Sequence, residues 1–506
     1  MRFPRTAGIL LHPTSFPGRY GIGDLGEAAY RFIDFLVEAR QSIWQILPLG
    51  PTGYGDSPYQ SFCTFAGNPL LISPDLLVAD GYLAETAVTN VPPFPAQTVD
   101  YGPVIEYKEK LLAQSFDYFE ANATAEQQAA FEQFCTDEAD WLDDYAFFMA
   151  LKDHHVEHEG GVWNTWPRPI AQREPEAMAE WGTKLARQVK RRQYLQFLFY
   201  QQWFRLKDYA NEYGIKIVGD IPIFVAFDSA DVWANQELFY LDETGTPTVV
   251  AGVPPDYFSE TGQRWGNPLY RWDKMAERNY DWWRRRLEMT FRQTDIVRID
   301  HFRGFEAYWE IPASEPTAVV GEWVKGPDKA FFHAMRQQLG ELPLIAEDLG
   351  VITPEVQDLR DTFNFPGMKI LQFAFGGAQE NHFLPHNYDT PNCVVYTGTH
   401  DNETTRGWYE NAADFEKDRV RRYLAVDGHD PAWDLIRLAF MSVADTAVIP
   451  LQDIMDLGNE ARMNFPGKAS GNWGWRYQPH QLTQPLALRL RELTEIYSRE
   501  PTENSA

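Results

Sequence analysis

Short runs of β-branched and other apolar residues recur along the chain, and each ends in polar residues before a stretch with helical patterning. Eight such runs occur, at 8–15, 42–51, 215–224, 295–304, 342–350, 368–375, 393–404 and 446–454. Near-continuous apolar runs are typical of parallel strands buried on both faces. Eight strand–helix units predict an α/β fold, a (β/α)8 TIM barrel, whose active site lies at the C-terminal ends of the strands. The polar residues stand at that end of every run, which supports the barrel more than the number of runs does.

The uneven spacing of the runs predicts insertions into one barrel spanning 1–506. The second and third runs are separated by a long segment with helical patterning at 106–122 and 191–214. We expect large, mainly helical insertions at about 55–190, after the second strand, and at about 225–285. The latter includes a long loop at 252–270, and a rim loop follows at 456–476. Loops of such length in a compact fold are commonly lids or binding loops.

Composition and charge exclude several classes of function. The formal net charge of −27 repels phosphate backbones and anionic lipid, so we expect neither a nucleic-acid nor a membrane partner. No segment approaches the roughly 20 apolar residues of a membrane span, and the N-terminal apolar run is too short for a signal peptide. Three scattered cysteines, Cys63, Cys135 and Cys393, cannot form a disulfide framework. These features predict a cytoplasmic protein.

Aromatic residues make up 15% of the chain, with 17 Trp, 24 Tyr and 33 Phe. Most of these rings must lie in the core. Aromatic faces also stack on the apolar faces of sugar rings, so part of the excess is consistent with a carbohydrate-binding cleft.

Arg298 and Asp300 stand two residues apart in the fourth run, so their side chains share one face of a strand. At the rim of a barrel that face is the interior. A neighbouring guanidinium lowers the pKa of a carboxyl group, which predicts an ionised Asp300 suited to act as a nucleophile. Taken alone, the motif is better explained by a structural ion pair.

Glu347 and Asp348 end the fifth run, and strand geometry turns only one of them toward the barrel axis. Glu347 directly follows the apolar residues and suits a general acid, whose pKa must be raised by burial or by a like charge. Asp348 is also explained as the N-cap of a following helix.

The seventh run ends in a dense polar cluster at 400–403, and Asp220 ends the third run. The cluster contains His400 and Asp401 and is suited to binding sugar hydroxyls or, equally, a metal. A helix start that uses Asp401 and Thr404 is an alternative explanation.

The combination of these motifs is more specific than any one of them. Acids at three separate strand ends, with Arg298, His301 and His400 beside them, are hard to explain as structure alone. Two carboxylates flanking a glycosidic bond, one as nucleophile and one as acid/base, are what glycoside chemistry requires.

Other motifs are weaker candidates. His154, His155 and His158 resemble a metal-binding face, but no fourth ligand is evident, and a solvated helix end explains them better. The glycine-rich pieces at 18–26 and 50–57 lack the GK[ST] of a phosphate-binding loop. We therefore expect no metal and no cofactor.

The whole chain resembles the amylomaltases, the 4-α-glucanotransferases of glycoside hydrolase family 77. The matching stretches are 8–26 (GILLHPTSFPGRYGIGDLG), 44–72, 219–235, 252–270 (GVPPDYFSETGQRWGNPLY), 297–305 (VRIDHFRGF), 345–350 (IAEDLG), 396–404 (YTGTHDNET) and 471–476 (GNWGWR).

This resemblance implies roles for individual residues. Asp300 would be the nucleophile, Glu347 the acid/base and Asp401 the transition-state stabiliser. The substrate-binding residues that it implies or that lie beside these acids are Arg298, His400, His301, Asp348, Asp220, Tyr59, Ser57, Tyr54, Tyr257, Phe258, Trp265, Asn267, Asn464 and Trp473.

The resemblance also implies an activity: transfer of α-1,4-glucan segments to the 4-hydroxyl of an acceptor sugar, by a retaining mechanism with a covalent glucosyl-aspartate. The partners would be α-1,4-glucans and maltooligosaccharides, with the chain a monomer or a weak homo-oligomer. A retaining hydrolase of the α-amylase type would use the same carboxylates and is the main alternative. A non-catalytic glucan-binding protein is disfavoured because all three acids are present.

Overall fold

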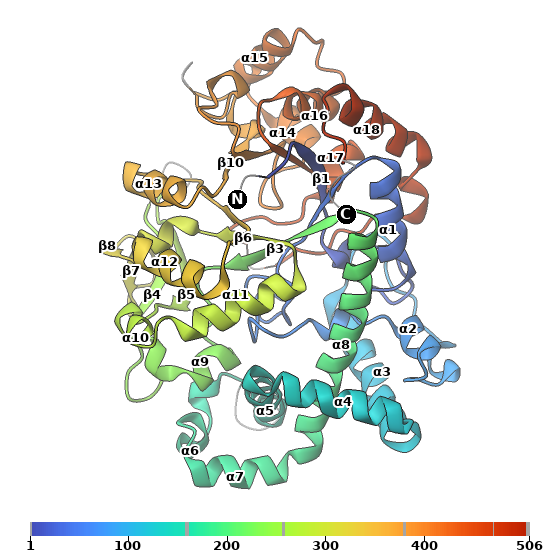
Figure 1. The fold of residues 1–506 in the computed structure, drawn as a ribbon, viewed down its shortest axis with the longest axis vertical. Coiled ribbons are helices and arrows are strands. Elements are labelled where there is room, and N and C mark those ends of the chain that lie inside the picture. The colour runs from blue at the N-terminus through green and yellow to red at the C-terminus, as the bar shows by residue number, and fades with distance from the viewer. Residues whose placement is uncertain (1–2, 157–160, 256–258, 378–380, 469, 502–506) are drawn as a thin grey trace.

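The computed structural model describes residues 3–156, 161–255, 259–377, 381–468 and 470–501. Its centre is a parallel sheet of eight strands, surrounded by helices (Figure 1). The strand order is β10–β11–β12–β1–β2–β3–β6–β9. The Ala346 N–H in β9 donates to the carbonyl of Pro366, just before β10, at 2.9 Å, so the two edges of the sheet meet. The strands are β1 Thr6–Leu10, β2 Ile43–Gln45, β3 Lys216–Pro222, β6 Ile296–Asp300, β9 Leu344–Ala346, β10 Gly367–Ile370, β11 Cys393–Tyr396 and β12 Thr446–Pro450. All eight predicted strands, and the barrel, are confirmed.

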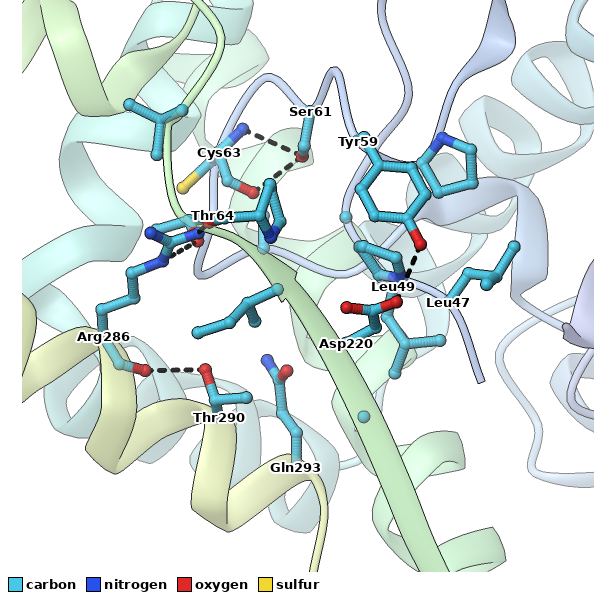
Figure 2. Close-up of a pocket in the computed structure, with 18 of the residues that line it drawn as sticks. Leu47, Leu49, Tyr59, Ser61, Cys63, Thr64, Asp220, Arg286, Thr290 and Gln293 are labelled. Carbon is cyan, nitrogen blue, oxygen red and sulfur yellow. Dashed lines mark hydrogen bonds between the residues drawn. The ribbon is translucent and has the colours of Figure 1, made fainter. Parts of the chain in front are cut away.

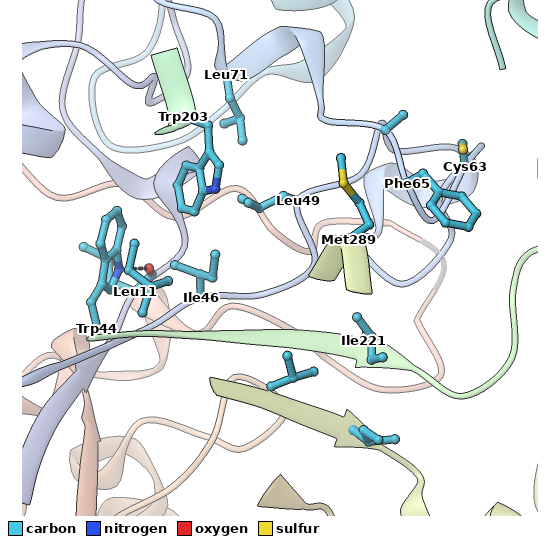
Figure 3. Close-up of a cluster of buried hydrophobic side chains, with 14 of the residues drawn as sticks. Leu11, Trp44, Ile46, Leu49, Cys63, Phe65, Leu71, Trp203, Ile221 and Met289 are labelled. Atoms are coloured by element: carbon cyan, nitrogen blue, oxygen red, sulfur yellow. Dashed lines mark hydrogen bonds between the residues drawn. The ribbon is translucent and has the colours of Figure 1, made fainter. Parts of the chain in front are cut away.

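The pleat of the strands divides their side chains between two packed layers. Residues such as Val218, Ile296 and Ile345 cluster with one another inside the barrel. Their neighbours, such as Trp44, pack outward, and Figure 3 shows Trp44 near Trp203 of the surrounding helices, with ring centroids 6.2 Å apart. Because side chains alternate along a strand, residues two positions beyond the inner cluster also face inward. Asp220, Arg298 and Glu347 have this spacing, so the fold brings their side chains together.

Helices surround the barrel and follow its strands. They are α1 Glu27–Glu38, α8 Ala186–Glu212, α11 Asp281–Gln293, α12 Asp328–Leu339, α13 Pro354–Thr362, α14 Thr405–Asn411, α15 Asp414–Leu424, α16 Pro431–Met441, α17 Leu451–Ile454 and α18 Gln484–Ile496. Within the described residues, no helix combines the length and apolarity needed to cross a bilayer.

The insertion between β2 and β3 is helical, as predicted, and its later helices occupy the lower part of Figure 1. It contains α2 Pro74–Ala79, α3 Tyr101–Asn122, α4 Ala125–Asp137, α5 Ala139–Val156, α6 Arg168–Ala171 and α7 Pro175–Lys184. His155 of α5 is buried and stacks on Trp166 with ring centroids 5.4 Å apart. The expectation of a solvated helix end is therefore wrong for this histidine.

The insertion after β3 differs from the prediction of mainly helical structure. Besides α9 Ala230–Ala234 and α10 Trp272–Glu277, it contains a hairpin of β4 Val249–Val253 and β5 Gln263–Pro268. This hairpin pairs with β7 Ala307–Pro312 and β8 Glu322–Lys325 in an antiparallel sheet of order β5–β4–β7–β8. The segment 252–270 is rich in Gly and Pro, which favours a loop, and the strand β7 that pairs with its β4 lies about sixty residues away in another insertion.

Candidate active site

Arg298 joins two carboxylates from neighbouring strands inside the barrel. Its Nη1 lies 2.8 and 2.7 Å from the two oxygens of Asp220, and its Nη2 donates to Asp300 Oδ1 at 2.9 Å. The β3–β6 register places Asp220 directly opposite Arg298. The Asp220 side chain is completely buried, whereas 32% of the Asp300 side chain is exposed. Asp300 is thus the carboxylate of this pair that a ligand can reach.

Tyr59 extends this network across the barrel to His400, which follows β11. Its hydroxyl donates to Asp220 Oδ2 at 2.7 Å, a contact drawn in Figure 2, and lies 2.8 Å from His400 Nε2. The rings of Tyr59 and His400 are stacked with centroids 5.3 Å apart, and Trp473 lies 6.0 Å from each of them. These contacts fix the wall of the site between β3 and β11.

Glu347 lies at the end of β9, and two backbone N–H groups hold its carboxyl group. His301 N–H donates to Oε2 at 2.8 Å, and Leu349 N–H donates to Oε1 at 2.9 Å. His301 adopts a left-handed backbone conformation with φ 55°. This turn, directly after Asp300, brings its N–H to Glu347 and so couples the two strand ends that carry the candidate nucleophile and acid.

Burial sets the ionisation of the two candidate catalytic carboxyls. It raises the pKa of Glu347 to about 8, and the nearby charge of Asp300 adds to that rise. Burial also raises the pKa of Asp300, although Arg298 opposes the rise. The predicted contact with Arg298 is present, but the predicted lowering of the Asp300 pKa is wrong because desolvation outweighs the ion pair. Burial and the nearby charge of Asp300 therefore favour the protonated form of Glu347 at neutral pH.

Asp401 follows β11 and is held from the rim. Asn464 donates to its Oδ1 at 2.7 Å, Arg462 donates to its backbone carbonyl at 2.9 Å, and His400 Nε2 lies 3.5 Å from Oδ2. The Asp401 side chain is 45% exposed. Thr404, not Asp401, caps the following helix α14. Asp401 is therefore free to face a ligand.

Arg462 was not predicted to belong to the site. Besides the Asp401 carbonyl, it donates to the Asn464 carbonyl at 2.8 Å. Arg462 therefore positions both Asp401 and Asn464, which contact each other through their side chains. Its place two residues before Asn464 in the rim loop was the available signal in the sequence.

The hairpin of β4 and β5, called the covering hairpin from here on, contributes Trp265. The Trp265 ring meets the His301 ring edge-on, with ring centroids 4.8 Å apart. Burial lowers the pKa of His301 to about 3, so this imidazole is neutral. Tyr257 and Phe258 lie outside the described residues, as does the side chain of Tyr54.

Three predicted substrate-binding residues have hydrogen-bond partners within the protein. Asp348 accepts from Arg360 at 2.5 Å and from the Met368 N–H at 2.7 Å, so it fastens β9 to β10 and caps no helix. Asn267 donates to the Val225 carbonyl at 2.9 Å. Ser57 accepts from the Tyr59 N–H at 3.3 Å. Asp220, likewise, is saturated by Arg298 and Tyr59, so it positions them and does not face a ligand.

Figure 2 shows a cavity that adjoins this site and is not lined by Asp300 or Glu347. Tyr59 and Asp220 line it together with Cys63, Arg286 and Gln293. It lies between strand ends and helix α11. Among the described residues, no group of three or more His, Cys, Asp or Glu side chains is arranged to hold a metal ion.

Comparisons with known proteins agree with this geometry. A model of the family described as 4-alpha-glucanotransferase, glycoside hydrolase family 77, matches residues 11–483. The 4-alpha-glucanotransferase of Thermus thermophilus is 54% identical over 99% of this chain and 100% of its own length, and that of Synechocystis sp. is 53% identical over 98% of both. The amylomaltase of Streptococcus agalactiae, solved in complex with acarbose, is 41% identical, with a TM-score of 0.95 over 98% of this chain and 100% of that one. The chain therefore belongs to the 4-alpha-glucanotransferases of glycoside hydrolase family 77 and is an enzyme of that class.

Proposed function

We propose that the enzyme transfers segments of α-1,4-glucan to the 4-hydroxyl of an acceptor sugar by a retaining double displacement. Asp300 acts as nucleophile, Glu347 as acid/base and Asp401 as transition-state stabiliser. The observation that carries the proposal is the unequal pair of carboxyls: Glu347, with a pKa raised to about 8, beside Asp300, held at 2.9 Å by Arg298.

In the first step, Glu347 donates its proton to the glycosidic oxygen as Asp300 attacks the anomeric carbon. The bond from that carbon to the leaving oxygen breaks, and an ester to Asp300 forms. The reducing-end part of the donor leaves with the proton. In this proposal the carboxylate of Asp401, held by Asn464, stabilises the positive charge that develops on the sugar.

Ester formation prepares the second step. It removes the negative charge of Asp300, which is one of the causes that raise the Glu347 pKa. The Glu347 pKa therefore falls, and the carboxylate accepts the proton of the acceptor 4-hydroxyl. The acceptor oxygen then attacks the anomeric carbon, and the ester bond to Asp300 breaks. Two inversions give net retention.

Transfer must outcompete hydrolysis. Water at roughly 55 M competes with an acceptor at millimolar concentration, so transfer needs a bias of about 10⁴–10⁵, or about 6 kcal/mol. Stacking of the acceptor on rim aromatics such as Trp265, and exclusion of water by the covering hairpin, are the sources we propose.

The test is to incubate the purified enzyme with maltotriose alone and to resolve the products by chain length. We expect glucose and a ladder of longer oligomers, both abolished by Asp300→Asn. Products shorter than the substrate only, with reducing ends rising in step, would make the enzyme a hydrolase. Acarbose, the ligand in the Streptococcus agalactiae amylomaltase structure, serves as a competing probe of the same site.

The covalent step needs its own measurement. A 2-fluoro maltosyl fluoride, which slows the second step more than the first, should add one glycosyl mass to a peptide that contains Asp300. Proton NMR of the transfer products should show that the newly formed glycosidic bonds are α. Newly formed β bonds would exclude retention.

A further inference from the structure

An exposed apolar surface lies beside the loop that carries Glu347. Trp323 on β8 is 39% exposed, Val351 is 54% exposed, and Val319 and Val320 are 54% and 51% exposed. Exposed apolar side chains gathered in one place on a soluble protein commonly mark a binding surface. None of these residues belongs to the site described above.

Arg303 connects this surface to the acid/base. Its guanidinium lies 3.7 Å from the centre of the Trp323 ring, and its Nη1 donates to the Val351 carbonyl. A backbone hydrogen bond also joins the two segments, because the Phe302 N–H donates to the carbonyl of Glu347 at 3.2 Å. The segments 301–303 and 347–351 thus run side by side from Glu347 outward to Trp323 and Val351.

The opposite side of the surface is tied to the covering hairpin. Trp309 packs edge-on against Trp323 with ring centroids 5.4 Å apart, and its Nε1 donates to the Ala318 carbonyl at 3.0 Å. The Ala318 N–H donates to the carbonyl of Thr261, between β4 and β5, at 3.1 Å. The surface therefore lies between two elements that border the active site, and the Trp323 ring is held in place by Arg303 and Trp309.

The acid/base role proposed for Glu347 indicates which part of a substrate would lie near this surface. The acid/base meets the leaving oxygen in the first step and the acceptor oxygen in the second. Sugars on the Glu347 side of the cleaved bond are therefore the leaving segment or the acceptor. On that side the segment 347–351 leads outward from Glu347 and ends beside Arg303 and Trp323.

We propose that Trp323, Val351, Val319 and Val320 form an outer surface that binds acceptor chains of several glucose units. This inference rests on the proposed function and adds the residues that make the enzyme sensitive to acceptor length. An indole ring and small apolar side chains suit the apolar face of a neutral sugar. A second copy of this chain is a poorer occupant, because both copies would carry a formal charge of −27.

The experiment separates acceptor binding from donor binding. The donor is α-maltotriosyl fluoride that lacks its terminal 4-hydroxyl, so it leaves fluoride behind and cannot itself accept. Fluoride release and transfer products are measured against glucose or maltotetraose as acceptor. For Trp323→Ala we expect the KM for maltotetraose relative to that for glucose to rise roughly threefold to tenfold.

Three further variants sharpen the result. Trp323→Phe keeps an aromatic ring and should retain most of the preference for maltotetraose. Val351→Ser leaves the stack on Arg303 in place and should give a smaller rise in the same ratio, so the test stands even where Trp323→Ala does not fold. Phe415→Ala, which removes a ring that is 60% exposed on α15, is the matched control and should leave the ratio unchanged.

An unchanged ratio in Trp323→Ala and Val351→Ser would overturn the proposal. So would sedimentation that shows a wild-type dimer and a Trp323→Ala monomer, because the surface would then be an interface between copies. A wild-type enzyme that releases fluoride but makes no transfer product would instead overturn the proposed function, so the two failures are distinguishable.

Discussion

Arg298 determines how the charges of the active site are shared, because it contacts Asp220 and Asp300 at once. The sequence motif shows only the second contact, since Asp300 is two residues away along the same strand. The first depends on the pairing of β3 with β6, which places Asp220 opposite Arg298. One guanidinium thus serves two carboxylates, and the charge of Asp220 works against the effect of Arg298 on the Asp300 pKa.

The Glu347 pKa gives a prediction for the pH dependence of transfer. The raised pKa keeps Glu347 protonated below about 8, so the acid required in the first step is present at neutral pH and is lost as pH rises through that value. Because the Asp300 charge contributes to the rise, Asp300→Asn should lower the Glu347 pKa. Carbon-13 NMR titration of labelled carboxyls measures it.

Glu347→Gln assigns the titrating resonance in that experiment. An unchanged or higher Glu347 pKa in Asp300→Asn would contradict the proton cycle proposed for the two steps.

Two buried carboxylates with arginine partners provide a matched pair of variants. Asp220→Asn removes a negative charge that pairs with Arg298 in the barrel interior. Asp348→Asn removes the negative charge that pairs with Arg360 on the flank of the barrel. Each should lower the free energy of unfolding by about 3–5 kcal/mol, measured by urea denaturation. Only Asp220→Asn should also reduce kcat strongly, because Arg298 positions Asp300. Equal losses of kcat would indicate that Asp348 acts on the substrate, as its sequence position suggested.

At the scale of elements, the barrel could be predicted from the sequence and the antiparallel sheet could not. Each barrel strand is a local run such as 393–396, buried on both faces, so its apolar residues are contiguous. In β5 only the last two residues are buried. Its partner β4 pairs in turn with β7, from another insertion, and no local pattern encodes such pairing.

The same distinction applies to the site. The three acids stand at the ends of contiguous runs and were predicted, whereas the roles of Asp348 and Asn267 depend on neighbours distant in sequence. Asp348 meets Arg360 and the Met368 N–H only because β9 and β10 close the barrel. A polar residue after a strand therefore predicts a place near the site but not the direction of its side chain.

The covering hairpin carries the prediction at this scale. Trp265→Ala removes the ring packed on His301 and opens the hairpin side of the site to water. We expect the ratio of hydrolysis to transfer to rise about tenfold, which corresponds to about 1.4 kcal/mol of the bias toward the acceptor. Product analysis with maltotriose measures the ratio, and Trp265→Phe should stay close to wild type. A ratio that does not change would remove the hairpin from the account of water exclusion.

At the scale of the whole molecule, two arginines join segments from opposite ends of the described chain. Arg499 lies after α18 and donates to six backbone carbonyls, at Thr6, Ala439, Phe440, Ser442, Ala444 and Asp445. Arg5 donates to three of these and to the carbonyl of Tyr497. Both side chains therefore satisfy carbonyls between the end of α16 and the start of β12, where strand β1 enters the barrel.

This arrangement predicts that Arg499→Ala destabilises the fold without altering the chemistry. The variant leaves buried carbonyls without donors, so the free energy of unfolding should fall by about 3 kcal/mol in urea denaturation. Thr6 begins β1, so the contact lies at the end of the barrel opposite Asp300 and Glu347, and kcat of the folded enzyme should stay within about twofold of wild type. Arg491→Ala on α18, which breaks only an exposed pair with Glu495, should change stability by about 0.5 kcal/mol or less. A fall in kcat of the folded enzyme well beyond twofold would contradict this prediction. It would show that contacts at this end of the barrel control the geometry of the active site at the other end.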